Sequence, residues 1–160
     1  MKLMLSQDSD GELSGLYKRV FQNAIELFIV TAFLTEWDDS LKLNSDCRSF
    51  RIIIGKDFGI TKKGACEKVM GWLPSKRKCQ FMAADRIDGF HPKAVFWKEN
   101  TGRSFAIIGS SNLTRAAFET NYEAIVYCPL SAADYAIAKQ WVKKIEAQSL
   151  VVSEDWLNKY

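Results

Sequence analysis

The chain has 160 residues, of which 48% are hydrophobic, and it carries a formal net charge of +3 with a pI of about 8.6. This size predicts a single domain over residues 1–160, and the apolar content is enough for a hydrophobic core. No apolar stretch reaches the length of a membrane span and no secretory signal precedes the first helix, so we expect a cytoplasmic protein with no membrane contact. The net charge is too small to indicate nucleic-acid binding by itself.

Apolar periodicity predicts helices and strands in alternation along the chain. The first helix is expected to follow a capping box at Ser9-Asp10-Gly11-Glu12 and to carry apolar residues from Leu13 to Ala24. The other expected helices are 61–73, 113–118 and a final one capped by Ser131 and Asp134 that carries Tyr135 to Ile145. The expected strands are 25–34, 51–55, 79–83, 93–98, 104–108 and 121–128. This order predicts an α/β fold in which a mixed β-sheet is flanked by helices on both faces.

The cysteine and histidine content argues against a metal centre. The four cysteines are widely spaced and form no C-x-x-C pair, so we expect isolated buried thiols in a reducing cytosol; they are Cys47, Cys66, Cys79 and Cys128. One histidine and no clustered carboxylates also fit neither a catalytic zinc nor a two-metal site. We therefore expect no metal ion and no other cofactor.

Two groups of basic residues could be solvated surface or could contact phosphate beside a site. The first is Lys62, Lys63 and Lys68, and the second is Lys76, Arg77 and Lys78. The five tryptophans are expected in the core or at an interface rather than as base-stacking platforms; base stacking stays open for Trp97, which lies in the motif strand.

The most informative feature is His91-Pro92-Lys93, followed sixteen residues after the lysine by Gly109-Ser110-Ser111-Asn112. A phosphoryl-transfer site needs a nucleophile or acid, a fixed positive charge and hydrogen-bond donors for the phosphoryl oxygens. If His91 and Lys93 both lie on the strand, period-two alternation points them to the same face. Asn112, after a tight turn, can donate to phosphoryl oxygens or cap a helix.

These residues resemble the phospholipase D superfamily, whose signature is H-x-K-x4-D-x6-G-S-x-N. Lys98 stands where the signature has Asp, with Glu99 beside it, and four extra residues fall in a predicted hairpin turn at 99–102. The chain is most similar to the superfamily's small nucleases, among them metal-independent restriction endonucleases.

The resemblance implies a metal-independent phosphodiesterase that cleaves DNA. The catalytic residues would be His91, Lys93, Asn112 and Glu123, with Ser110 and Ser111 binding substrate and Glu119 competing for the role of Glu123. Neutral imidazole can attack phosphorus to give a phosphohistidine, while a second imidazolium protonates the leaving alkoxide. Because the chain has one histidine, we expect a symmetric homodimer that shares one site.

Two other functions stay open. One is a lipid phosphodiesterase of the same superfamily, and the other is a nucleic-acid-binding module of the same fold without activity. No sequence-reading domain fits within the chain, which could therefore be the nuclease part of a longer restriction or DNA-processing protein.

Overall fold

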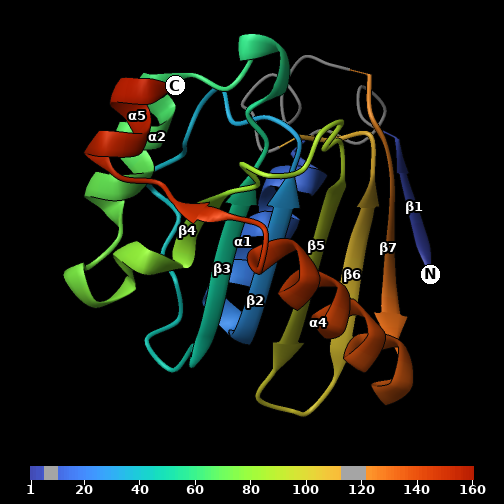
Figure 1. Cartoon of the computed structure of the whole chain (residues 1–160). Helices are drawn as coiled ribbons and strands as arrows, with labels where there is room; N and C mark the ends of the chain where they lie inside the picture. Colours follow the sequence, from blue (N-terminus) through green and yellow to red (C-terminus); the bar gives the residue numbers. More distant parts are fainter. Residues whose placement is uncertain (6–10, 113–121) are drawn as a thin grey trace.

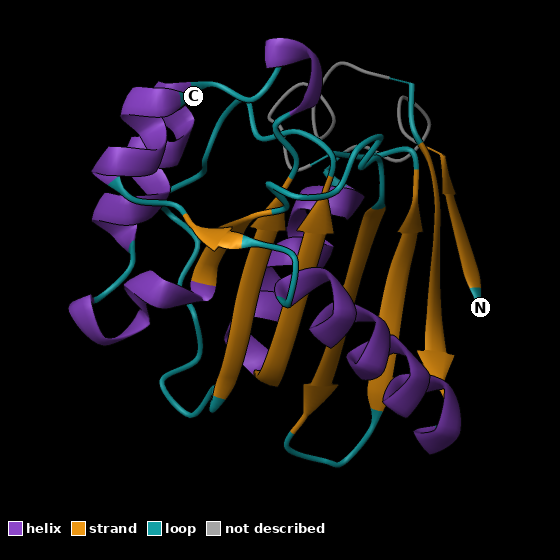
Figure 2. Ribbon diagram, viewed as in Figure 1, coloured by secondary structure: helices purple, strands orange, loops and turns teal. Residues whose placement is uncertain are grey.

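The computed structural model describes residues 1–5, 11–112 and 122–160, and these form one eight-stranded mixed sheet (Figures 1 and 2). The strand order is β1-β7-β6-β5-β2-β3-β4-β8. The strands are β1 Lys2–Leu5, β2 Ala24–Thr31, β3 Ser49–Ile54, β4 Phe81–Ala83, β5 Lys93–Glu99, β6 Ser104–Gly109, β7 Ala124–Leu130 and β8 Leu150–Val151. The helices are α1 Glu12–Asn23, α2 Lys63–Trp72, α4 Ala132–Glu146 and α5 Glu154–Lys159, with 3-10 turns η1 Asp57–Gly59 and η2 Ser75–Gln80.

Helices cover both faces of the sheet, which confirms the predicted fold class. In Figure 1, α4 crosses in front of the sheet and α1 lies behind it. One apolar cluster joins α1, α2 and α5 to one face and includes Phe21, Phe50 and Trp97. A second, smaller cluster joins α4 to the other face through Tyr135 and Val142.

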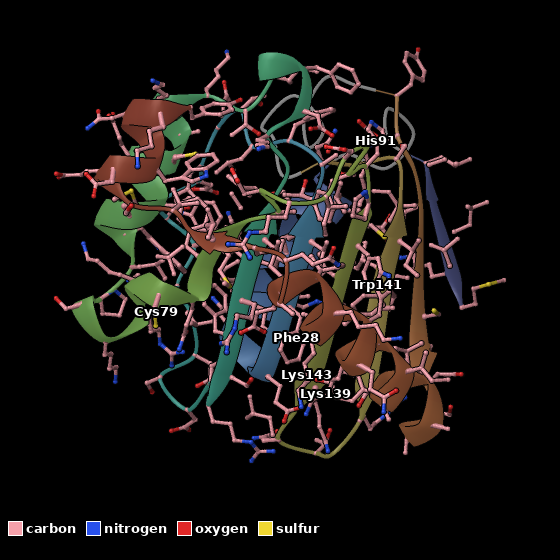
Figure 3. The ribbon with its side chains drawn as sticks, viewed as in Figure 1. Phe28, Cys79, His91, Lys139, Trp141 and Lys143 are labelled. Carbon is pink, nitrogen blue, oxygen red and sulfur yellow. The ribbon has the colours of Figure 1, made fainter. Side chains whose placement is uncertain are left out.

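The directions of the strands decide which connecting segments lie at the same edge of the sheet. β2 pairs in parallel with β3, and β3 with β4, whereas β5 runs antiparallel to β2. β6 is antiparallel to β5, and β7 to β6. The residues that follow β2, β3 and β6 therefore lie at the same edge of the sheet as the residues that precede β5 and β7. We call this the site edge; it is the upper edge in Figures 1 and 2, and the label of His91 lies there in Figure 3.

Most predicted elements are present with shifted ends, and the capping prediction is wrong. A capping box would place Glu12 in the third helical position, but α1 begins at Glu12 with Gly11 as its N-cap (φ 68°) and no side-chain cap. Ser9 and the predicted helix 113–118 lie outside the described residues. Ser131 does cap α4, accepting from the Asp134 N–H at 3.1 Å.

Short elements at the sheet margins escaped the sequence analysis. Ala24 belongs to β2 rather than to the first helix, and Cys79 lies in η2 before β4 begins. The missed elements are β1, β8 and α5. The helix that was predicted to be the final one corresponds to α4, and α5 follows it. These segments are too short for an apolar pattern to identify them.

A buried carboxylate ties the sheet to α4. Glu26 on β2 is 7% exposed and accepts hydrogen bonds from the Tyr135 hydroxyl (2.9 Å) and the Lys139 ammonium (3.2 Å), with Arg48 at 3.7 Å. Burial alone would raise the pKa of Glu26, but the hydrogen bonds from Tyr135 and Lys139 and the nearby charges outweigh it and lower the pKa.

We predict that Glu26→Gln lowers the free energy of unfolding by about 1–3 kcal/mol at pH 7. Because the folded-state pKa lies below the ordinary value of 4.5, the stabilisation is complete above that value and is lost as pH falls through the folded pKa. Urea unfolding of both proteins between pH 7 and pH 3 should show the difference shrinking in acid. A difference that stays constant over this range would contradict the assignment.

Candidate active site

His91 and Lys93 lie together at the site edge. β5 begins at Lys93, so His91 and Pro92 precede the strand rather than lie on it. The Lys93 ammonium is 3.0 Å from His91 Nδ1 and 3.4 Å from Nε2. Since an ammonium group only donates, the ring nitrogen that meets it accepts. The Phe33 ring packs edge-on against the imidazole, 5.4 Å between centroids, and holds it from the β2 side.

Asn112 reaches the same place from the end of β6. The Thr31 hydroxyl lies 3.3 Å from Asn112 Oδ1 and 3.1 Å from the Phe33 carbonyl oxygen. Thr31 is opposite Lys93 in the β2–β5 pairing, so the amide of Asn112 is held beside that lysine. The amide nitrogen of Asn112 has no partner among the described residues and can donate to a bound anion.

Ser110 and Glu123 form a pair across the β6–β7 junction. The Ser110 hydroxyl donates to Glu123 Oε2 and accepts from the Ala124 N–H at 3.0 Å. Ser111 is buried, and its hydroxyl donates to the Asn112 carbonyl at 3.1 Å, which stabilises the turn. The pairing of Glu123 with Ser110 had no signal in the sequence, because it depends on which strands are neighbours. Glu119 lies outside the described residues.

The charge of Glu123 acts on the residues around it. Burial lowers the pKa of Lys93, and the Glu123 carboxylate opposes this effect. Burial also raises the pKa of Tyr17, on α1 beneath this part of the sheet, and Glu123 raises it further. Glu123 is thus close enough to Lys93 to favour its charged form.

Gly109 allows β6 and β7 to approach closely just before the Ser110 turn. A Cβ built there would collide with the Ala124 carbonyl oxygen and would lie 2.8 Å from Ile125 Cα. Both obstacles are backbone atoms of β7, which is paired with β6 at this point. Only glycine fits here without separating the strands that position Ser110 and Glu123.

The position where the superfamily signature has Asp lies far from this site. Lys98 is five residues along β5 from Lys93, roughly 16 Å at the rise of a strand. Its neighbour Glu99 accepts a hydrogen bond from Trp97 Nε1 at 3.3 Å.

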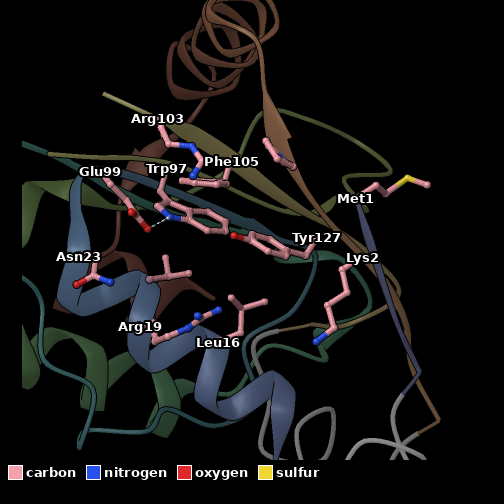
Figure 4. Close-up of a pocket in the computed structure, with 12 residues that line it drawn as sticks. Met1, Lys2, Leu16, Arg19, Asn23, Trp97, Glu99, Arg103, Phe105 and Tyr127 are labelled. Atoms are coloured by element: carbon pink, nitrogen blue, oxygen red, sulfur yellow. Dashed lines mark hydrogen bonds between the residues drawn. The ribbon is translucent and has the colours of Figure 1, made fainter. Parts of the chain in front are cut away.

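Figure 4 shows Glu99 in a separate pocket of about 460 Å³ that Arg19 and Arg103 also line. Trp97 is 1% exposed and stacks on Phe105, so it is a core residue.

The two basic groups differ in position. Lys62 donates its backbone N–H to the Leu34 carbonyl, which places the start of α2 near the site edge. The second group precedes β4 and therefore lies at the opposite edge of the sheet. Arg77 is buried there and donates to the Cys47 carbonyl, so neither alternative, solvated surface or phosphate contact, holds for this residue.

The described cysteines and acidic residues form no ligand cluster. All four cysteines are free, but only Cys47 and Cys66 are buried, so the expectation of four buried thiols is wrong. Within residues 1–5, 11–112 and 122–160, no group of three His, Cys, Asp or Glu side chains could hold a metal ion. No helix in the same ranges is long and apolar enough to cross a membrane.

The chain belongs to the phospholipase D-like family, since the sequence family described as "Cardiolipin synthase, PLD-like domain" matches residues 29–148. The fold is similar to that of NucT from Helicobacter pylori, at 15% identity and a TM-score of 0.67, over 94% of this chain and 98% of that one. It is also similar to a phospholipase D family member, Nuc from Salmonella typhimurium, at 14% identity and a TM-score of 0.69, over 96% and 97% of the two chains. None of the curated protein sequences matches this chain. The family predicted from His91, Lys93 and the Gly-Ser-Ser-Asn turn is thus confirmed.

We predict that Gly109→Ala lowers the free energy of unfolding by about 2 kcal/mol, because the added methyl group meets backbone that cannot rotate away. Gly71→Ala in α2 is the matched control: a Cβ there meets nothing within 4 Å, and alanine should stabilise the helix by about 0.5–1 kcal/mol. Urea denaturation measures both. Equal effects of the two replacements would show that the β6–β7 contact does not require glycine.

Proposed function

We propose that the chain is a metal-independent phosphodiesterase that cleaves DNA through a phosphohistidine at His91. The observation that carries this proposal is the contact of His91 with Lys93, beside the Asn112 amide, whose oxygen is held by Thr31 and whose nitrogen has no partner among the described residues. A nucleophilic ring, a fixed cation and an amide donor are what an in-line attack on a phosphodiester needs. Ser110, held by Glu123, supplies a further polar contact at the same edge.

The proposed reaction has two steps. As the phosphate binds, Lys93 turns from the ring to a phosphoryl oxygen, and the unprotonated nitrogen of neutral His91 forms a bond to phosphorus. The bond from phosphorus to the leaving oxygen breaks as an imidazolium gives that oxygen its proton. Water then attacks phosphorus, the P–N bond breaks, and the imidazole that gave up its proton takes one from the water. Lys93 and Asn112 stabilise the charge on the phosphoryl oxygens throughout.

The second imidazole is proposed to be His91 of the partner subunit. The sequence holds one histidine, whereas the two steps need one neutral and one protonated ring. A two-fold axis beside the site would bring both rings, and both copies of Lys93 and Asn112, around one phosphate. His91 supports this arrangement by its position, since it is exposed at the site edge rather than enclosed within one chain.

DNA is proposed as the substrate on chemical and family grounds. The start of α2 brings Lys62 and Lys63 to the site edge, where cations can meet a phosphate backbone. The fold is similar over nearly its whole length to those of NucT and of Nuc, a phospholipase D family member. The resemblance of the His91, Lys93 and Asn112 motif to the superfamily's small nucleases supports a nuclease over a lipid phosphodiesterase. Free cysteines fit the reducing cytoplasm that we propose as its location.

We predict that DNA cleavage persists in excess EDTA and is abolished by His91→Ala, because the nucleophile is lost. Lys93→Ala should lower the rate about 10²–10³-fold through the loss of a transition-state donor. Lys98→Ala, on the same strand but distant from His91, is the matched control and should leave the rate unchanged. Gel assays on single- and double-stranded DNA, with a short-chain phospholipid in parallel, measure these rates. Activity that requires added magnesium, or survives in His91→Ala, would contradict the mechanism.

We predict that mixing subunits reveals a shared site. Wild type refolded with an equal amount of His91→Ala should retain about a quarter of the activity of all-wild-type protein at the same total concentration, since about a quarter of randomly assorted dimers carry both histidines. Refolded wild type alone controls for losses in refolding. A retained activity of about one half would show that each chain works independently.

A further inference from the structure

Two aromatic side chains on either side of the candidate active site are almost fully exposed to solvent. Phe58 is 82% exposed and Tyr122 is 87% exposed. The next most exposed aromatic side chain among the described residues is Trp141, at 39% and packed edge-on against Phe96. Single exposed apolar side chains are common on protein surfaces, but these two belong to segments at the site edge, where a bound ligand could cover them.

Phe58 is held in a strained conformation. Its φ of 62° is the one positive value at a non-glycine residue in the described part of the chain. An aromatic residue rarely adopts this left-handed conformation, and such strain persists where the surroundings enforce it. The neighbouring residue is anchored to the loop before β5: Asp57 Oδ2 accepts the backbone N–H of Phe90 at 3.1 Å.

That contact links the Phe58 turn directly to the nucleophile, because Phe90 immediately precedes His91. The turn η1 follows β3 and rises above the site edge, as the short turn at the top of Figure 1 shows. The cavity beside Phe58 is also lined by Lys159, whose ammonium has no partner among the described residues. The two carboxylates that line it are engaged, Asp57 with Phe90 and Asp85 with Lys56.

Tyr122 lies on the other side of His91. It immediately precedes Glu123 and β7, whereas Phe58 follows β3. In the strand order β7-β6-β5-β2-β3, the strand that follows His91 is central, with β7 and β3 each two strands away. Phe58 and Tyr122 therefore belong to segments that reach the site edge on opposite sides of the strand that follows His91.

We infer that Phe58 and Tyr122 stack on unpaired bases of the strand whose phosphate enters the active site. This inference rests on the proposed function, and it names the substrate class as single-stranded nucleic acid. Bases in a duplex already stack on their neighbours, so exposed rings gain most from a strand whose bases are free. Lys62 and Lys159, near the Phe58 turn, would meet the phosphates between those bases.

The test is binding of two fluorescent strands of equal length and charge, oligo-dT and an abasic strand, to inactive His91→Ala protein. Phe58→Ala and Tyr122→Ala should each weaken oligo-dT binding about tenfold, which is about 1.4 kcal/mol. Neither should change binding of the abasic strand, and Phe58→Tyr should restore oligo-dT binding. Trp141→Ala, which removes an exposed ring from α4, is the matched control and should change neither affinity.

Unchanged oligo-dT binding in both alanine variants, or an equal loss for the abasic strand, would overturn the inference. Light scattering is measured on the same samples, and a dimer that dissociates on either replacement would instead assign the rings to the contact between subunits. Cleavage of oligo-dT by protein with His91 intact is scored separately. If cleavage is absent while the stacking result holds, the proposed function fails and the binding role stands; if cleavage is present while binding is unchanged, only the inference fails.

Discussion

The antiparallel pairing of β2 with β5 is the contact on which the candidate active site depends. It sets Thr31 opposite Lys93, so that one buried hydroxyl fixes the amide of Asn112 beside the lysine. The same pairing turns the chain so that His91 arrives at the edge where β2 ends, against Phe33. β5 inserted in the parallel direction would carry His91 to the opposite edge of the sheet, away from Asn112.

Close packing of β6 on β7 completes the arrangement. Gly109 permits the approach of the two backbones, and the Ser110 hydroxyl then bridges to Glu123 at the start of β7. Polar side chains that follow β6 and that precede β5 and β7 therefore lie at the same edge of the sheet. Groups that the sheet already holds in position do not have to be ordered when the substrate binds. Such preorganised groups stabilise a transition state most effectively.

The part of the fold that long apolar patterns specify could be predicted from the sequence. The isoleucines of β3 and the hairpin around Gly102 are local signals, and so is the Ser131 cap of α4. β1 and β8 could not be found, because strands of four and two residues gain their stability from neighbours that are distant in sequence.

The residues of the candidate site also divide into those that could be predicted from the sequence and those that could not. His91, Lys93 and Asn112 carried a motif, and the structure brings them together. The anchoring hydroxyl of Thr31 and the exposed ring of Phe58 carried none, because one depends on strand register and the other on a backbone angle. The basic run that contains Arg77 left solvated surface and phosphate contact as alternatives, and the structure shows neither for this residue, which is buried at the opposite edge and donates to the Cys47 carbonyl.

The most direct test of the account is to trap the covalent intermediate. Protein mixed with end-labelled single-stranded DNA and quenched in alkali within the first turnover should carry a DNA fragment on His91, identified by mass spectrometry of the peptide that contains it. The P–N linkage should be lost on brief acid treatment, and Lys98→Ala protein should form the same adduct. Cleavage that proceeds with no adduct, or with the fragment on another residue, would contradict the assignment of His91 as the nucleophile.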